Sequence, residues 1–154
     1  MLSFADLLAR SAPPIGTFLS SAALAPIEIA KASGLDFIVI DTEHALISPG
    51  DVEAMIVLAR AIELPPLVRV PDHGYADVQQ LLDAGAAGIF VPHVSSAEQA
   101  STVVGQMLHP PLGSRGAHGG MRAAGFGLDA AARASYPDPA QTWRVAMIEE
   151  REAV

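Results

Sequence analysis

The tetrapeptide Asp41-Thr42-Glu43-His44 places two carboxylates and an imidazole directly behind the apolar run 37–40. A histidine near its ordinary pKa can take up a proton at neutral pH, and a carboxylate on its second nitrogen would fix the tautomer and raise its basicity. Reactive groups at the C-terminal ends of strands are typical of α/β-barrel enzymes. His44 is therefore a candidate base, and a polar loop residue without a chemical role is the alternative.

Arg69 is the second candidate, in the run Val68-Arg69-Val70-Pro71 at the end of another apolar stretch. A guanidinium presents a planar fork of donors that matches a carboxylate, and it can also stabilise the charge of a developing enolate. This favours an α-keto acid as the ligand. An ion pair with a neighbouring acidic loop residue is the competing interpretation.

Strands and helices must alternate to position these residues. Short apolar runs predict buried strands at 15–19, 37–40, 67–70, 88–91 and about 144–148. Helical spacing from Val52 to Ile62 follows the start signals Ser48 and Pro49, and a further helix is expected from about 96 to 108. The glycine- and proline-rich segment from 110 to 127 predicts a long loop.

This alternation predicts an α/β fold in a single domain over residues 1–154. We expect a (β/α)8 barrel of the TIM type with only about the first five strand-helix units present, because such barrels take about 250 residues. A doubly wound open sheet is the alternative. The turn around Ser20 and Ser21, however, has no glycine-rich phosphate loop of the kind found in such sheets.

The composition restricts the possible classes of partner. With 51% hydrophobic and 17% charged residues, the chain is expected to be globular rather than disordered. A formal net charge of −8 disfavours nucleic acids and anionic membranes, and no run reaches the roughly 18 apolar residues of a membrane span. Since the chain has no cysteine, any metal must be bound by oxygen or histidine nitrogen, and a cytoplasmic location is expected.

In combination and in order, these motifs resemble the HpcH/HpaI aldolase family, from about Ile15 to the end of the chain. Asp41-Thr42-Glu43-His44 is similar to the family's Asp-x-Glu-His, whose histidine is the proposed general base. Val68-Arg69-Val70-Pro71 is similar to a strand whose arginine is assigned to pyruvate and the transition state. The resemblance implies a metal-dependent lyase that forms or cleaves 4-hydroxy-2-oxo acids, with pyruvate and an aldehyde as its small-molecule partners.

The resemblance also suggests a role for Asp83, in the segment Gln80-Leu81-Leu82-Asp83-Ala84-Gly85. The matching aspartate of the family is described as raising the basicity of the catalytic histidine. By pattern, however, Asp83 ends a helix and precedes a strand, so it should lie towards the opposite face of the barrel. Asp41 is the nearer candidate partner of His44, and the choice between the two stays open.

Residues 145–149 match the family's Gln-x-Glu segment, which implies that Glu149 is a metal ligand. Hard oxygen donors suit Mg²⁺ or Mn²⁺, with Co²⁺ as a further candidate. Met147 stands where the family has a substrate-binding glutamine, and its thioether cannot donate the amide's hydrogen bond. The remaining histidines share no metal-like spacing and are interpreted as surface or loop residues, although His93 and His118 are expected near the reactive face: His73, His93, His109 and His118.

The similarity covers only about three fifths of a family member, in keeping with the size of such barrels. The family's second metal-binding aspartate has no counterpart, so we expect little or no aldolase activity from the chain alone. We also expect the chain to form a homo-oligomer. Lys31 is the only lysine and falls on a predicted helix, which favours metal over Schiff-base chemistry. Two alternatives remain: a non-catalytic relic or complementing fragment, and a citrate-lyase-like enzyme acting on acyl-CoA.

Overall fold

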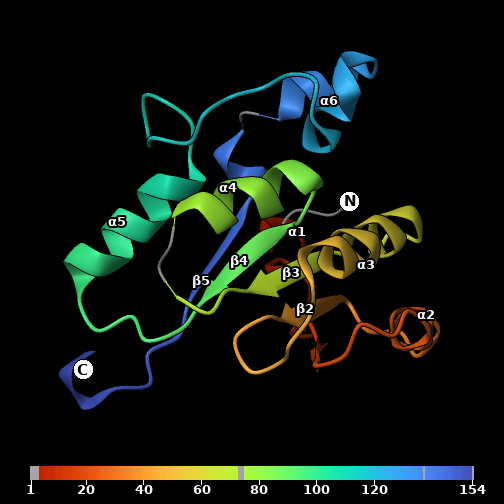
Figure 1. Ribbon diagram of the computed structural model, residues 1–154, viewed down its shortest axis with the longest axis horizontal. Coiled ribbons are helices and arrows are strands. Elements are labelled where there is room, and N and C mark those ends of the chain that lie inside the picture. The colour runs from red at the N-terminus through yellow and green to blue at the C-terminus, as the bar shows by residue number, and fades with distance from the viewer. Residues whose placement is uncertain (1–3, 73–74, 137, 154) are drawn as a thin grey trace.

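The computed structural model describes residues 4–72, 75–136 and 138–153, whose arrangement is shown in Figure 1. The strands of this part are β1 (Gly16–Leu19), β2 (Phe37–Asp41), β3 (Pro66–Arg69), β4 (Gly88–Val91) and β5 (Trp143–Ala146). Its α-helices are α1 (Phe4–Leu8), α2 (Ala25–Ala32), α3 (Pro49–Ala61), α4 (Tyr75–Ala84), α5 (Ala97–Met107) and α6 (Ala130–Ser135). Short 3-10 helices are η1 (Arg122–Gly127), η2 (Pro139–Gln141) and η3 (Arg151–Ala153). None of the described helices combines the length and apolarity needed to cross a bilayer.

The strands form one parallel sheet in the order β1-β2-β3-β4-β5, which is also their order along the chain. A doubly wound sheet reverses its strand order at a switch point, whereas a (β/α)8 barrel adds each strand beside the preceding one. The structure therefore confirms the α/β fold and the first five strand-helix units of a barrel. The predicted bounds of β4 match the observed ones, and those of the other strands differ by at most two residues.

The sheet has an apolar core on each face. On one face, alternate strand residues pack with α2, α3, α4 and α5, among them Ile38, Ile40, Val68, Ile89 and Val91. The opposite face, which is the inside of a barrel, carries Val39, Leu67 and Trp143, and Leu7 of α1 packs against them. Because successive side chains of a strand point to opposite faces, Asp41 and Arg69 follow Val39 and Leu67 onto the inner face.

Local signals in the sequence explain where the helices begin and end. The Ser48 side chain accepts a hydrogen bond from Asp51 N at the start of α3, with a proline in the first turn. Gly34 and Gly85 have φ angles of 79° and 108°, the left-handed region expected after a helix. The predicted long loop contains the 3-10 helix η1, and the Asp129 side chain then caps α6 after the loop.

Substitution of Gly88 is expected to disrupt the junction of β4 and β5. Gly88 is the Cα partner of Trp143, and a Cβ at Gly88 would collide with the carbonyl oxygen and Cβ of Trp143. Gly88→Ala should therefore lower the free energy of unfolding by about 1–3 kcal/mol, measured by urea titration. Gly105→Ala, in α5 with nothing within 4 Å of the new Cβ, should raise it by about 0.5–1 kcal/mol. Equal stability of the two variants would contradict this packing.

Candidate active site

The register of β2 and β3 places Asp41 beside Arg69, since the two residues are Cα partners. Arg69 donates from Nε to Asp41 Oδ1 at 3.0 Å and from Nη2 to Asp41 Oδ2 at 2.8 Å. Their side chains are only 12% and 4% exposed, respectively. A bidentate pair of this kind fixes the plane of the guanidinium, so Arg69 is held in one orientation at the C-terminal rim of the sheet.

Aromatic rings inside the barrel support the same guanidinium. The Cζ atom of Arg69 lies 5.0 Å from the centroid of the Phe18 ring, and Phe18 meets Phe90 edge-on with 5.8 Å between centroids. Phe18 belongs to β1 and Phe90 to β4, so these contacts connect Arg69 with strands on either side of its own. A cation over an aromatic face is attracted by the ring quadrupole, which adds to the orientation imposed by Asp41.

Glu43 brings a second carboxylate to Arg69 and links it to His44. Its Oε2 lies 3.1 Å from Arg69 Nη1, and its Oε1 lies 3.7 Å from His44 Nε2. Asp41 instead accepts hydrogen bonds from the main-chain N–H groups of Glu43 and His44, each at 3.2 Å. Asp41 therefore shapes the turn that carries His44, and Glu43 is the carboxylate that faces its imidazole. The His44 side chain is 70% exposed and can meet a ligand from solvent.

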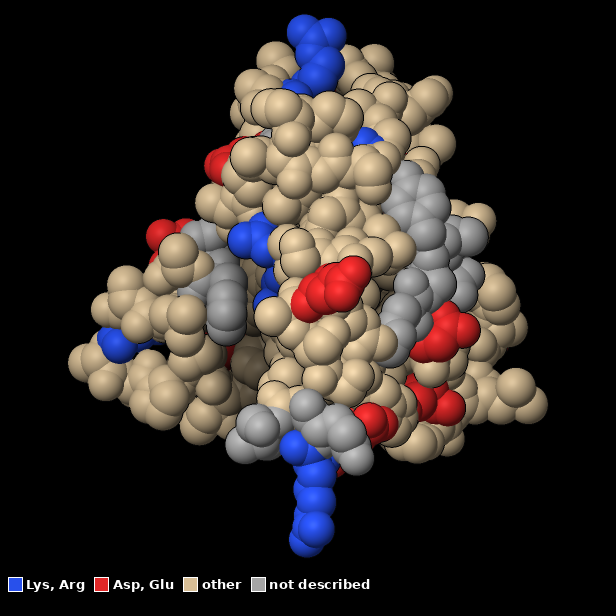
Figure 2. Space-filling model, turned by 90° about the vertical axis from the view of Figure 1, so that its left-hand side faces the viewer, with Lys and Arg blue, Asp and Glu red and all other residues tan. Residues whose placement is uncertain are grey.

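His93 extends this cluster to the end of β5. Its ring Nε2 lies 3.2 Å from Glu43 Oε1, and its ring Nδ1 lies 3.1 Å from Glu150 Oε1. Its main-chain N–H donates to Glu149 Oε1 at 2.9 Å. The contacts thus run from Asp41 through Arg69, Glu43 and His93 to the two glutamates after β5. Figure 2 views the molecule from the side on which β5 ends in Figure 1, and several acidic side chains lie close together there.

The charges of this cluster shift two pKa values. Burial alone would raise the pKa of Asp41, but the hydrogen bond and charge of Arg69 and the N–H groups of His44 and Glu43 outweigh it, and the pKa is lowered. The hydrogen bond to Asp41, followed by the charges of Asp41, Glu43 and Glu149, raises the pKa of Arg69. Arg69 therefore remains a cation, and the charge of Glu149 after β5 contributes to its raised pKa.

The lowered pKa of Asp41 predicts a loss of stability in acid. The folded chain binds fewer protons at this group than the unfolded chain, so the free energy of unfolding rises with pH through the titration. The contribution is fully present above the ordinary aspartate pKa of about 3.9 and disappears as the pH falls through the lower folded value. Urea titrations between pH 2.5 and 7 should show a shallower acid dependence for Asp41→Asn than for the wild type, and identical slopes would contradict the assignment.

The other residues singled out in the sequence lie in different places. Asp83 is at the end of α4, next to the N-terminal end of β4, and accepts hydrogen bonds from Arg115 Nη2 at 2.7 Å and Tyr136 Oη at 3.1 Å. The structure therefore does not bring Asp83 to His44. Met147 extends the β4–β5 pairing through its main chain, with N donating to Val91 O and its carbonyl accepting from Val94 N. No role of its thioether follows from these contacts.

The remaining histidines divide between the rim and the periphery. His93 is an exposed loop residue, as expected, and it also belongs to the rim cluster. The His109 ring packs against Tyr136 with 4.8 Å between centroids, and His118 is exposed. His73 lies outside the described residues. A signal for His93 was available, because it follows β4 at the same end of the sheet as Asp41 and Arg69 follow their own strands.

The donor chemistry of the rim fits a hard divalent cation only in part. In residues 4–72, 75–136 and 138–153, no group of three histidine, aspartate or glutamate side chains is disposed to hold a metal. Glu149 can supply one carboxylate, and its Oε1 is already oriented by His93 N. The buried Oε2 atom of Glu43 accepts no hydrogen bond of good geometry in the described part of the chain, but it is ion-paired with Arg69 Nη1 at 3.1 Å, so it is not an open metal ligand. Substrate and water oxygens would have to complete the coordination.

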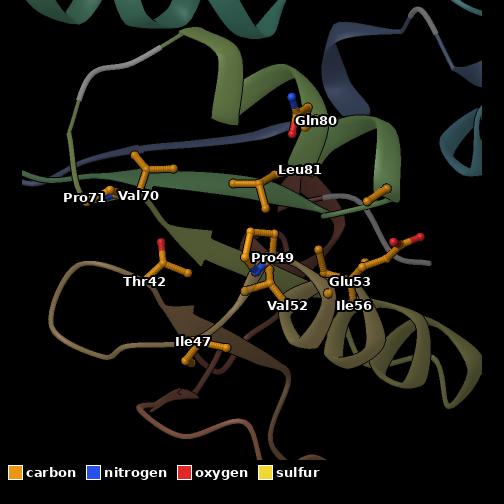
Figure 3. Close-up of a pocket in the computed structure, with 12 residues that line it drawn as sticks. Thr42, Ile47, Pro49, Val52, Glu53, Ile56, Val70, Pro71, Gln80 and Leu81 are labelled. Carbon is orange, nitrogen blue, oxygen red and sulfur yellow. The ribbon is translucent and has the colours of Figure 1, made fainter.

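A separate cavity of about 450 Å³ lies between α3 and α4, as Figure 3 shows. Its walls include Ile47, Val52 and Leu81, and Thr42 and Pro71 reach it from the loops after β2 and β3. The charged residues of the rim do not line it. The cavity is therefore a groove between two helices on the outside of the sheet and no part of the charged cluster.

Comparison with known proteins finds relatives that match most of this chain. Residues 14–154 match the family described as HpcH/HpaI aldolase/citrate lyase. The hydroxypyruvate/pyruvate aldolase of Agrobacterium fabrum is 44% identical over 107 residues, which are 68% of this chain and 39% of that protein. The 4-hydroxy-2-oxovalerate aldolase of Novosphingobium aromaticivorans is 36% identical over 129 residues, 81% of this chain and 48% of that protein. The chain thus spans less than half the length of these relatives.

Solved structures agree with the sheet order. The HpcH/HpaI aldolase from Desulfitobacterium hafniense superposes with a TM-score of 0.85 at 28% identity, over 99% of this chain and 59% of that one. The citrate synthase SbnG superposes with a TM-score of 0.79 at 32% identity, over 99% of this chain and 58% of that one. In both cases the chain corresponds to somewhat more than half of the solved fold.

Proposed function

The chain belongs to the HpcH/HpaI aldolase/citrate lyase family, and from this premise we propose that it carries the pyruvate-handling part of a metal-dependent carbon-carbon lyase site. The observation that supports this most directly is the continuous series of contacts Asp41–Arg69–Glu43–His93–Glu149 along the C-terminal rim. Together with the exposed His44 imidazole beside Glu43, this series puts the fixed cation of Arg69 and the carboxylate of Glu149 at one end of the sheet, which is where barrel enzymes carry out chemistry.

Arg69 is suited to hold the keto acid. A guanidinium has five N–H donors, and three of its nitrogens face carboxylates of Asp41 and Glu43. Two N–H groups remain for a substrate carboxylate or for the enolate oxygen. Because Asp41 and Glu43 fix the guanidinium before any ligand arrives, little reorganisation is needed when negative charge develops.

His44 is suited to move the proton. Removal of a proton from the methyl group of pyruvate leaves the electron pair of the C–H bond in a new C=C bond, and the keto oxygen becomes an enolate oxygen. His44, directly or through one water, would accept that proton, and Glu43 at 3.7 Å would stabilise the charged imidazole. The enolate carbon would then attack the aldehyde carbon, whose C=O π electrons move onto its oxygen, and the proton held by the imidazole would pass to that oxygen, directly or through water, to give a 4-hydroxy-2-oxo acid; cleavage is the reverse.

Glu149 would be the ligand that this chain supplies to Mg²⁺, Mn²⁺ or Co²⁺. When bound, such an ion acts as a Lewis acid that lowers the free energy of the enolate. The remaining ligands, the acceptor aldehyde and the expected homo-oligomer stay predictions, and so does the expectation that the chain alone has little complete aldolase activity.

The test is deuterium exchange into the methyl group of pyruvate, followed by proton NMR in D₂O with added MnCl₂ at low concentration. Exchange needs no acceptor aldehyde, so it isolates the step assigned to His44 and Arg69. We expect exchange above that of manganese alone. A rate equal to the metal-only control would contradict a working enolisation site in this chain.

The family description, HpcH/HpaI aldolase/citrate lyase, supports a second candidate, a citrate-lyase-like enzyme that acts on an acyl-CoA thioester. The two candidates differ in the ligand that Arg69 would meet. Isothermal titration with pyruvate and with acetyl-CoA, each with and without metal, distinguishes them, and we expect the smaller keto acid to bind.

A further inference from the structure

The main chain of His93 has an unusual conformation. Its φ angle is 54°, in the left-handed region that few non-glycine residues adopt, although histidine, asparagine and aspartate do so more often than others. In this conformation the N–H group donates to Glu149 Oε1 at 2.9 Å, across 56 residues of sequence. Strained backbone persists where the surrounding structure enforces it, and it is concentrated at functional sites. The strain here directs one N–H donor at one carboxylate oxygen.

The imidazole of His93 is tied to the same carboxylates. Nδ1 lies 3.1 Å from Glu150 Oε1 and 3.6 Å from Glu149 Oε1, while Nε2 lies 3.2 Å from Glu43 Oε1. A neutral imidazole donates from one ring nitrogen only, so in either tautomer one of these two contacts is a hydrogen bond and the other nitrogen faces a carboxylate with its lone pair. The ring therefore lies between the turn after β2 and the segment after β5, and the tautomer decides which of the two it hydrogen-bonds.

Glu149 needs such support because of where it lies. It stands three residues beyond the last residue of β5, and its side chain is 37% exposed. A glutamate in that position can occupy many rotamers, and ordering it on binding a metal would weaken the affinity. Hydrogen bonds to a metal-binding carboxylate remove part of this loss by holding the oxygen in place beforehand.

We infer that His93 is a positioning residue that orients Glu149 for a divalent cation and ties it to Glu43 across the rim. The inference rests on the proposed function, since it takes Glu149 to be a metal ligand. It adds a residue that neither spacing nor resemblance singled out. It also gives the two parts of His93 different roles: the main-chain N–H holds Glu149, and the ring lies between Glu150 and Glu43.

The first experiment measures Mn²⁺ binding to the full chain by EPR, without substrate. His93→Ala removes the ring contacts, and because alanine disfavours a positive φ it also loosens the main-chain N–H from Glu149, so we expect the Mn²⁺ affinity to fall about 10–100-fold, the usual loss when a group supporting a ligand is removed. His93→Asn should recover most of the affinity, because its amide nitrogen can replace Nδ1 and asparagine tolerates a positive φ. His118→Ala, at an exposed histidine outside the cluster, is the matched control and should bind like the wild type.

The second experiment needs no metal. In ¹H–¹⁵N spectra of the metal-free chain, the His93 amide proton should move when Glu149→Gln removes the charged acceptor, and Glu98→Gln on α5 should leave it in place. A merely structural role of His93 would lower the melting temperature without this specific shift.

The outcomes separate the two proposals. If the wild-type chain binds Mn²⁺ and His93→Ala binds it with the same affinity, the positioning role is overturned and the metal site stands. The same holds if the His93 amide signal does not respond to Glu149→Gln. A wild-type chain that binds no Mn²⁺ would overturn the metal site itself, and the positioning role with it. Weakened binding in the alanine variant, recovery in the asparagine variant and the amide shift together would establish the inference.

Discussion

Replacement of Arg69 by methionine is expected to lower the free energy of unfolding by about 3–5 kcal/mol. The substitution keeps an unbranched apolar stem of comparable reach but removes the charge that faces Asp41 and Glu43. Those carboxylates are only 4% and 9% exposed, so each would be left with too little water to replace its partner. The loss should appear in urea or guanidinium titrations at pH 7 and needs no enzymatic activity.

Two further variants show whether the loss comes from the buried pair. Asp41→Asn combined with Arg69→Met should be less destabilised than the sum of the single variants, because the double variant no longer buries a lone charge at Asp41. Arg10→Met is the matched control, since Arg10 forms an exposed pair with Asp36 and should cost no more than about 1 kcal/mol. Equal losses at Arg10 and Arg69 would mean that burial of the rim pair contributes nothing.

The fold could be predicted because its signals are local. Each strand is a short apolar run between turn residues, and Gly34 and Gly85 follow helix ends with the positive φ angles that glycine readily adopts. The pairing of Asp41 with Arg69 could not be predicted in the same way. It depends on the register of β2 against β3, which joins residues 28 positions apart. The sequence offered an ion pair and a substrate-binding role for Arg69 as alternatives, whereas the geometry allows both at once.

The rim residues show how much of the candidate site residue type and spacing can predict. Glu43 lies inside the motif that predicted His44, yet its position between Arg69 and His93 depends on three strands meeting at one end of the sheet. His93 was expected near the reactive face, but its contacts with Glu43 and Glu150 were not predicted, because they join residues that are far apart in the sequence. Asp83 shows the reverse: its place at a helix end correctly suggested the far end of the sheet, against the role that resemblance assigned to it.

Replacement of His44 by asparagine is expected to reduce the rate of deuterium exchange into pyruvate by about 10²–10⁴-fold, the contribution typical of a general base. Asparagine keeps a polar side chain of similar volume but cannot accept the methyl proton at neutral pH. Because the His44 side chain is 70% exposed and its main-chain N–H to Asp41 is preserved, the free energy of unfolding should change by less than about 0.5 kcal/mol. The effect would thus fall on chemistry and leave the fold unchanged.

The comparison that decides the role of His44 is with His118→Asn, which removes an exposed imidazole from outside the rim cluster. Both variants should melt like the wild type and bind Mn²⁺ with unchanged affinity, and only His44→Asn should lose exchange. If exchange survives in His44→Asn but is lost in Glu43→Gln, the proton acceptor is the carboxylate that lies between Arg69 and the His44 ring. Loss of exchange in His44→Asn and in Glu43→Gln alike fits a His44 base whose charged form Glu43 stabilises from 3.7 Å. Survival of exchange in both of these variants would show that the turn after β2 takes no part in the reaction.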